Sequence, residues 1–173
     1  MNHTDHVNLI RAGVISGTWA DFGSGTGAFT LALADLLGTD GTIYSIDKDQ
    51  AALREQQGVM QVRFPHVKVH YRHLDFRQNF ELPKLDGVLM ANSLHFYREK
   101  EAIIARIKGF IRPGGHMILV EYNVDHGNNW VPYPLSYHSW AELAQASGFR
   151  HTSLLATHPS RFLGEFFSAV SDN

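Results

Sequence analysis

The 173-residue sequence contains no cysteine. This absence excludes disulfide bonds, thiolate zinc sites, iron–sulfur clusters and cysteine nucleophiles from the chemistry of the chain. No stretch approaches the ~18 apolar residues of a membrane-spanning helix, and the polar N-terminal residues lack the apolar core of a secretory signal. We therefore expect a cytoplasmic protein that has no membrane partner.

An excess of charge of one sign is also missing. Fifteen lysine and arginine residues stand against seventeen aspartate and glutamate residues, which gives a formal charge of −2. This balance provides no overall positive field for a phosphate backbone, so we expect no nucleic-acid partner. The hydrophobic fraction of 44% is typical of a globular chain, and the length predicts a single domain over residues 1–173.

Internal repeats are absent, and short β-type runs alternate with amphipathic segments. This alternation predicts an α/β fold. The expected helices cover about the first 15 residues, with Thr4 or Asp5 as the N-cap, and residues 28–37, 49–63, 102–111 and 139–148. The expected strands cover residues 18–22, 42–47, 67–71, 85–91, 116–122, 149–157 and 162–170.

A glycine-rich loop, Asp21-Phe22-Gly23-Ser24-Gly25-Thr26-Gly27, joins the first expected strand to the next helix. Its glycines permit positive φ angles and close approach of a ligand, and the helix N-terminus presents free N–H groups. The pattern fits a plain tight turn, a dinucleotide-binding loop or a loop for another ligand. Asp21 favours the last of these, because its carboxylate would repel a pyrophosphate and would suit an ammonium or sulfonium group.

Asp21-x-Gly23-x-Gly25-x-Gly27 resembles the first motif of class I S-adenosylmethionine-dependent methyltransferases. Other segments resemble the later motifs of that family in the same order: Tyr44 to Asp47, Leu74 to Phe76, Leu85 to Asn92 and Ile111 to Met117. The resemblance is to the small, type-11-like domains and extends over residues 18–123. It implies a doubly wound, Rossmann-like sheet of seven strands, mostly parallel with the last strand antiparallel, and helices on both faces.

The resemblance also implies the cofactor, S-adenosyl-L-methionine, and the residues that would hold it. Asp47 would accept hydrogen bonds from the ribose hydroxyls, Asp75 would meet the adenine amino group, and Asp21 would lie near the methionine part. The other expected cofactor-binding residues are Gly23, Ser24, Gly25, Gly27, Lys48, Leu74, Phe76, Ala91 and Asn92. The three aspartates also have structural alternatives, namely a helix cap, an Asx turn and an acceptor for N–H groups of the glycine loop.

Methyl transfer is an in-line displacement, so alignment of the reacting atoms and exclusion of water supply most of the acceleration. A base is needed only where the acceptor must lose a proton. His95 is the expected catalytic base, because histidine exchanges protons near neutral pH. His126, His138 and Tyr133 are alternatives.

Eleven histidines in one chain raise the question of a metal site. The spacings within residues 3–6 and 66–73 could be read as ligand patterns. No cysteine or cluster of carboxylates accompanies them, so we expect no metal.

The acceptor pocket is expected to form from the N-terminal helix, residues 1–17, and the loop 123–137. Trp130, Tyr133 and Tyr137 would line it, because aromatic rings suit an apolar or planar acceptor. The same rings could instead cover the end of the sheet or form a dimer contact. Residues 92–95 depart from the Asp/Asn-Pro-Pro-Tyr/Phe motif of the methylases that act on amino groups of DNA bases, which disfavours a nucleobase acceptor.

We therefore predict an enzyme that transfers a methyl group from S-adenosyl-L-methionine to a small molecule and leaves S-adenosyl-L-homocysteine. It would be a monomer or a homodimer. The alternatives are a small NAD(H)-binding oxidoreductase, a non-catalytic S-adenosylmethionine-binding protein and a protein methyltransferase.

Overall fold

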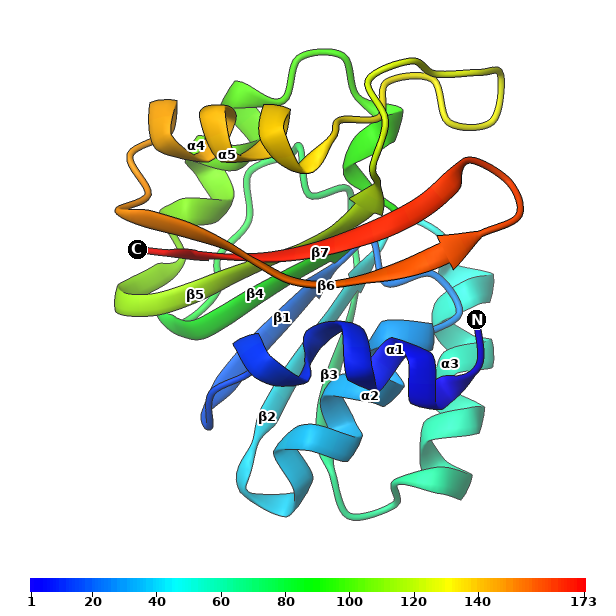
Figure 1. The fold of residues 1–173 in the computed structure, drawn as a ribbon. Coiled ribbons are helices and arrows are strands. Elements are labelled where there is room, and N and C mark those ends of the chain that lie inside the picture. The colour runs from blue at the N-terminus through cyan, green and yellow to red at the C-terminus, as the bar shows by residue number, and fades with distance from the viewer.

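The computed structural model describes residues 1–173 and contains a single seven-stranded sheet (Figure 1). The strands are β1 (Thr18–Phe22), β2 (Thr42–Asp47), β3 (Lys68–His73), β4 (Leu85–Ala91), β5 (Ile111–Tyr122), β6 (His151–Ser160) and β7 (Gly164–Asp172). The α-helices are α1 (His3–Ile10), α2 (Ala28–Leu37), α3 (Gln50–Arg63), α4 (Glu101–Lys108) and α5 (Tyr137–Ala146). Short 3-10 turns are η1 (Arg11–Gly13), η2 (Gly38–Asp40) and η3 (Leu94–Phe96).

The strand order is β3-β2-β1-β4-β5-β7-β6. Strands β1 to β5 pair in parallel, whereas β7 is antiparallel to both β5 and β6. Helices α1, α2 and α3 cover one face of the sheet, and α4 and α5 cover the other (Figure 1). This arrangement confirms the predicted doubly wound, mostly parallel sheet with its last strand antiparallel.

Side chains that alternate along each strand build two cores, one on each face of the sheet. In β4, Leu89 packs with the helices α1 and α2, while Val88 and Met90 pack with α4 and α5. All three side chains are fully buried. The nearly continuous apolar sequence of this strand therefore reflects its central position in the sheet.

The N-cap of α1 is Asn2, so the prediction of Thr4 or Asp5 was wrong. The Asn2 side chain accepts a hydrogen bond from the Asp5 N–H at 3.0 Å, and the Asp5 carboxylate accepts one from the Asn2 N–H at 2.7 Å. This reciprocal capping box satisfies two N–H groups at once. Asp5 thus belongs to the first turn of the helix.

Strand β5 begins at Ile111, earlier than predicted, because Ile111 pairs with Leu85 of β4 ahead of the paired run that starts at His116. The register with β4 shifts between Leu85 and Gly87, which accommodates this start. Strands β6 and β7 each end later than predicted. None of the helices is long and apolar enough to cross a membrane.

Candidate functional site

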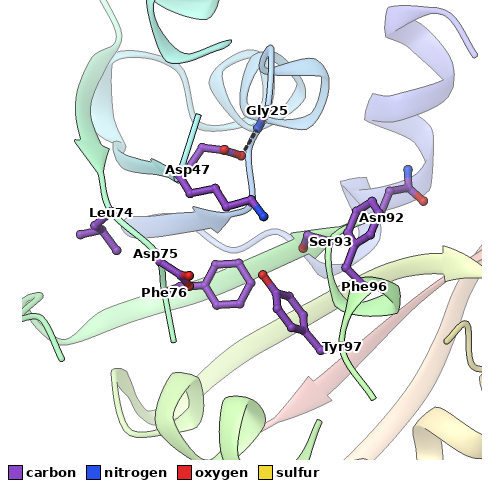
Figure 2. A pocket seen from close by; sticks show the side chains of 11 residues that line it. Gly25, Asp47, Leu74, Asp75, Phe76, Asn92, Ser93, Phe96 and Tyr97 are labelled. Carbon is purple, nitrogen blue, oxygen red and sulfur yellow. Dashed lines mark hydrogen bonds between the residues drawn. The ribbon is translucent and has the colours of Figure 1, made fainter. Parts of the chain in front are cut away.

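A cavity of about 330 Å³ lies at the carboxyl ends of the parallel strands (Figure 2). This is the edge at which open α/β sheets bind ligands. Eleven residues line the cavity: Gly23, Gly25, Asp47, Lys48, Leu74, Asp75, Phe76, Asn92, Ser93, Phe96 and Tyr97. Of these, Ser93, Phe96 and Tyr97 were not predicted individually as cofactor-binding residues, but they belong to the segment from Met90 to Tyr97, which was expected nearest the methyl group.

Asp47, the last residue of β2, holds the glycine loop in place. Its Oδ2 accepts a hydrogen bond from the Gly25 N–H at 2.7 Å, and its Oδ1 accepts one from the Asp49 N–H at 2.8 Å (Figure 2). Each carboxylate oxygen has a second lone pair, so both can still accept a hydrogen bond from a ligand hydroxyl. Asp49 in turn caps α3 through the N–H groups of Ala51 and Ala52.

Gly25 has a φ angle of +53°, and a Cβ atom built on it would meet nothing within 4 Å. Since Gly25 lines the cavity, a side chain there would project into the space of a ligand. Gly27 differs, because its Cβ would lie 2.4 Å from Cγ of Gln56. Gly27 is therefore required by the packing of α3 behind the loop, and the structure places it outside the cavity wall.

An apolar wall faces Asp47 across the cavity. The rings of Phe76 and Tyr97 meet edge to face with centroids 5.5 Å apart, and Leu74 adds a third apolar side chain (Figure 2). Asp75 points its carboxylate at Arg77, with Oδ2 accepting from Nη2 at 2.5 Å. This guanidinium holds the pKa of the Asp75 carboxyl below its usual value.

Asp21 is not in the cavity wall, which corrects the expectation that its carboxylate faces the ligand. Its side chain is buried and accepts a hydrogen bond from the Thr30 hydroxyl at 2.6 Å. Burial raises the pKa of Asp21 to about 7. The carboxyl thus fixes the start of α2 behind the glycine loop.

Ser24 and Ala91 also lie outside the cavity wall. The Ser24 hydroxyl is buried 2.8 Å from the hydroxyl of Ser45, which donates to Oε1 of Gln56. Ala91 is half-buried at the end of β4. Both residues support the loop and the strand end from behind.

His95 lies in η3 beside a glutamate that the sequence analysis did not single out. Its Nδ1 is 2.7 Å from Oε2 of Glu121, and Oε1 of the same carboxylate accepts from the N–H groups of Leu94 and His95. Glu121 is fully buried and His95 is 3% exposed. A charged residue that interrupts the apolar run of β5 was the signal that could have found Glu121.

The His95–Glu121 pair is one layer behind the cavity. His95 itself is not in the wall, but its ring centroid is 4.3 Å from that of Phe96, which is. On its other side the imidazole lies 6.1 Å from the ring of Tyr122. Glu121 accepts from Nδ1–H, so the other ring nitrogen, Nε2, is left without a hydrogen-bond partner.

Asn92 has a φ angle of +52° and is the only residue other than glycine with a positive φ. Its N–H donates to the carbonyl of Val120 at 2.9 Å. Its side-chain Oδ1 is buried without a partner. Such an orphaned acceptor beside a cavity suits a ligand that carries N–H or O–H donors.

Residues 20–117 match the protein family described as "Methyltransferase domain". The chain belongs to this family. The matching family is type 12, where the sequence analysis expected type 11. Membership of this family accounts for the order of the motifs along the chain. The cavity is built from segments that resembled the family motifs.

The chain is also similar in sequence to named proteins and in fold to solved structures. The domain is 24% identical over 163 residues to the reducing polyketide synthase grgA of Penicillium, covering 80% of this chain and 6% of that protein. It is 30% identical over 111 residues to the O-methyltransferase cnsE of Penicillium expansum, covering 61% of this chain and 38% of that protein. The solved CurJ carbon methyltransferase superposes with a TM-score of 0.73 at 18% identity, over 90% of this chain and 48% of that chain.

The cavity of the methyltransferase domain fits S-adenosylmethionine, the cofactor of its family, on two observations. Gly25 leaves open the place that a Cβ would fill, and the buried Oδ1 of Asn92 lacks a donor. A carboxylate at one end and an apolar wall at the other suit a ribose and an adenine ring. No group of three or more histidine, aspartate or glutamate side chains lies in a metal-binding arrangement.

None of Trp130, Tyr133 and Tyr137 lines the cofactor cavity, and their place in an acceptor pocket stays a prediction. Trp130 is 72% exposed and Tyr133 is 41% exposed. Tyr137 packs against Phe167 in the core, with ring centroids 6.0 Å apart. The alternative histidines, His126 and His138, are exposed.

The N-terminal end of α1 lines a different cavity of about 640 Å³. Met1, Asn2 and Asp5 share its wall with Tyr122 and Phe162. Phe162, between β6 and β7, lies 6.3 Å from the ring of Trp130 and 6.0 Å from that of Tyr122. These aromatic side chains connect the loop 123–137 to the carboxyl end of β5.

Proposed function

We propose that this domain transfers a methyl group from S-adenosylmethionine to a small molecule that loses a proton from oxygen or carbon, with His95 as the base. The observation that carries the proposal is the buried His95–Glu121 pair, which lies directly behind Phe96 of the cavity wall. When bound, the cofactor supplies a methyl group on a sulfonium centre. No base would be required for an acceptor that is already a free nucleophile.

The chain's own residues divide the binding of the cofactor among themselves. Asp47 would accept hydrogen bonds from the ribose hydroxyls, each worth on the order of 1.5–3 kcal/mol because the acceptor is charged. Leu74, Phe76 and Tyr97 offer an apolar surface for the adenine. The Asn92 side chain and the open position at Gly25 would then receive the methionine part.

Glu121 would orient His95 for proton transfer. The carboxylate accepts from Nδ1–H, which fixes the neutral tautomer with its lone pair on Nε2. The proton that the acceptor loses would pass to Nε2, and Glu121 would stabilise the resulting imidazolium. Two backbone N–H groups hold Glu121 Oε1, so the pair keeps its geometry without the ligand.

The chemistry of the relatives supports an acceptor that loses a proton. One is named an O-methyltransferase and another a carbon methyltransferase. Hydroxyl groups and carbon atoms next to carbonyls both need deprotonation before they attack a methyl group. The first relative is a polyketide synthase, which is consistent with an acidic carbon beside a carbonyl as acceptor.

A panel of phenols and β-dicarbonyl compounds, assayed for release of S-adenosylhomocysteine, tests this function. For a compound that the parent protein methylates, His95→Gln and Glu121→Gln should each lower the turnover by about 10²-fold or more, as expected for loss of a general base. The affinity for S-adenosylhomocysteine should stay unchanged. The matched control is His138→Gln, because His138 is exposed and pairs only with Glu142. Unchanged turnover in both variants would contradict the role of His95.

A further inference from the structure

A second cavity, of about 390 Å³, adjoins the cofactor cavity on the side of α4. The two cavities share Phe96 and Tyr97 as a common wall. The other lining residues are Arg77, Arg98, Glu99, Ala102, Ile103 and Arg106. We call this space the arginine cavity, because three arginine residues from three separate segments line it.

Positive charge in the arginine cavity exceeds negative charge. Glu99 is the one carboxylate in its wall. Arg77 is neutralised by Asp75, but neither Arg98 nor Arg106 forms an ion pair with any carboxylate.

Contacts with neutral groups hold these arginines in place. Arg106 donates from Nη1 to the carbonyl of Gln78 at 2.6 Å and to Oδ1 of Asn79 at 2.8 Å. Arg98 lies over the ring of Tyr133, 5.9 Å from its centroid. Neutral contacts of this kind orient the guanidinium groups while leaving their charge uncompensated.

We propose that the arginine cavity binds an anionic group of the methyl acceptor, a carboxylate or a phosphate monoester. This inference rests on the proposed function and names the class of its substrate. Guanidinium groups bind such oxygen anions through paired N–H donors. The shared wall of Phe96 and Tyr97 places that anionic group next to the cofactor, so the acceptor would span both cavities.

Titrations of ¹⁵N-labelled protein saturated with S-adenosylhomocysteine test the proposal. Sodium acetate and methyl phosphate serve as probes at constant ionic strength, and NMR shifts of the arginine Nε–H groups and of the backbone of residues 96–106 report binding. The test variant is the double substitution Arg98→Gln and Arg106→Gln. The control is Arg54→Gln with Arg150→Gln, which removes the same charge at exposed positions outside the cavity.

We expect saturable shifts that weaken about tenfold or more in the test variant and persist in the control. Saturation by acetate identifies a carboxylate as the favoured group, and saturation by methyl phosphate alone identifies a phosphate. Shifts that do not saturate, or that are equal in both variants, would overturn the arginine cavity as a site. Failure of S-adenosylhomocysteine to bind in the same samples would instead overturn the proposed function.

Discussion

Asp47 is the residue through which the end of β2, the glycine loop and the cofactor cavity are connected. Its two carboxylate oxygens already hold the N–H groups of Gly25 and Asp49. We predict that Asp47→Asn weakens binding of S-adenosylhomocysteine about tenfold or more, since a ribose would lose its charged acceptor. Isothermal titration calorimetry measures this change. The exposed variant Asp40→Asn should bind as the parent does, and equal affinity of both variants would contradict the role of Asp47.

Asp21 makes the stability of the domain depend on pH. Burial raises its pKa to about 7 in the folded protein, well above the ordinary 3.8, so the folded state holds this proton more tightly than the unfolded state. Stability from this group is therefore present below pH 4 and is lost as the pH rises to 7.

We predict that the free energy of unfolding of the parent falls relative to that of Asp21→Asn by about 1.4 kcal/mol for each pH unit between 4 and 7. Urea unfolding at a series of pH values measures the difference. Asp40→Asn supplies the control, because it changes an exposed carboxyl. A difference that does not vary with pH would mean that Asp21 is ionised throughout.

Most of the cavity wall could be predicted from the sequence, because motif residues follow strand ends and strand ends meet at one edge of the sheet. The directions of the Asp21 and His95 side chains could not be predicted. Whether a side chain at or just after a strand end turns into the cavity or behind it depends on its neighbours, Thr30 for Asp21 and Glu121 for His95. Those partners lie in other elements, and no spacing rule indicates them.

At the scale of elements, the glycine loop between β1 and α2 can be compared with the C-terminal end of α2. The comparison separates the effect of a positive φ on stability from its effect on ligand binding. Gly25 and Gly38 have similar φ angles, +53° and +59°, and a Cβ on either would meet nothing within 4 Å. Only Gly25 lines the cavity. Replacing either by alanine therefore imposes a positive φ on a residue with a Cβ, in two different surroundings.

We predict that Gly25→Ala and Gly38→Ala each lower the free energy of unfolding by about 1–3 kcal/mol. Only Gly25→Ala should weaken S-adenosylhomocysteine, because its methyl group occupies the cavity. Thermal unfolding and calorimetric titration measure the two effects separately. Equal affinities in the two variants would show that the ligand does not approach the loop at Gly25.

The elements themselves were largely readable from the sequence. The bounds of β1, β2, β4 and α2 match the prediction, because each lies between clear turn or cap residues. Ends without clear turn or cap residues differ: β5 begins early, since Ile111 still pairs with Leu85 of β4 across a register shift. Hydrogen bonding to a neighbouring strand, which a single segment does not reveal, decides these boundaries.

At the scale of the whole molecule, α1 closes the core on the side of β6 and β7. Leu9 is 2% exposed and packs with residues of α2 and the sheet. We predict that Leu9→Ala lowers the free energy of unfolding by about 2–5 kcal/mol. Leu154→Ala, at a position that is 45% exposed, should cost far less. Urea unfolding measures both, and equal losses would show that α1 is not docked as described.

The acceptor region was the part of the molecule least accessible to prediction. Its aromatic residues were identified by type, but Tyr137 belongs to the core and Trp130 to the surface. The three arginines that line the arginine cavity come from the loop after β3, the loop after η3 and α4. These segments are far apart in the sequence, and only the fold brings them to one cavity.

We expect the cavity at the carboxyl ends of β1, β2 and β4 to bind S-adenosylmethionine. Calorimetric titration of the protein with S-adenosylmethionine, S-adenosylhomocysteine and NADH tests it most directly. We predict binding of the first two ligands with dissociation constants on the order of 1–100 μM, about −8 to −5.5 kcal/mol, and none of NADH. Binding of NADH alone would contradict the account and assign the glycine loop to a dinucleotide.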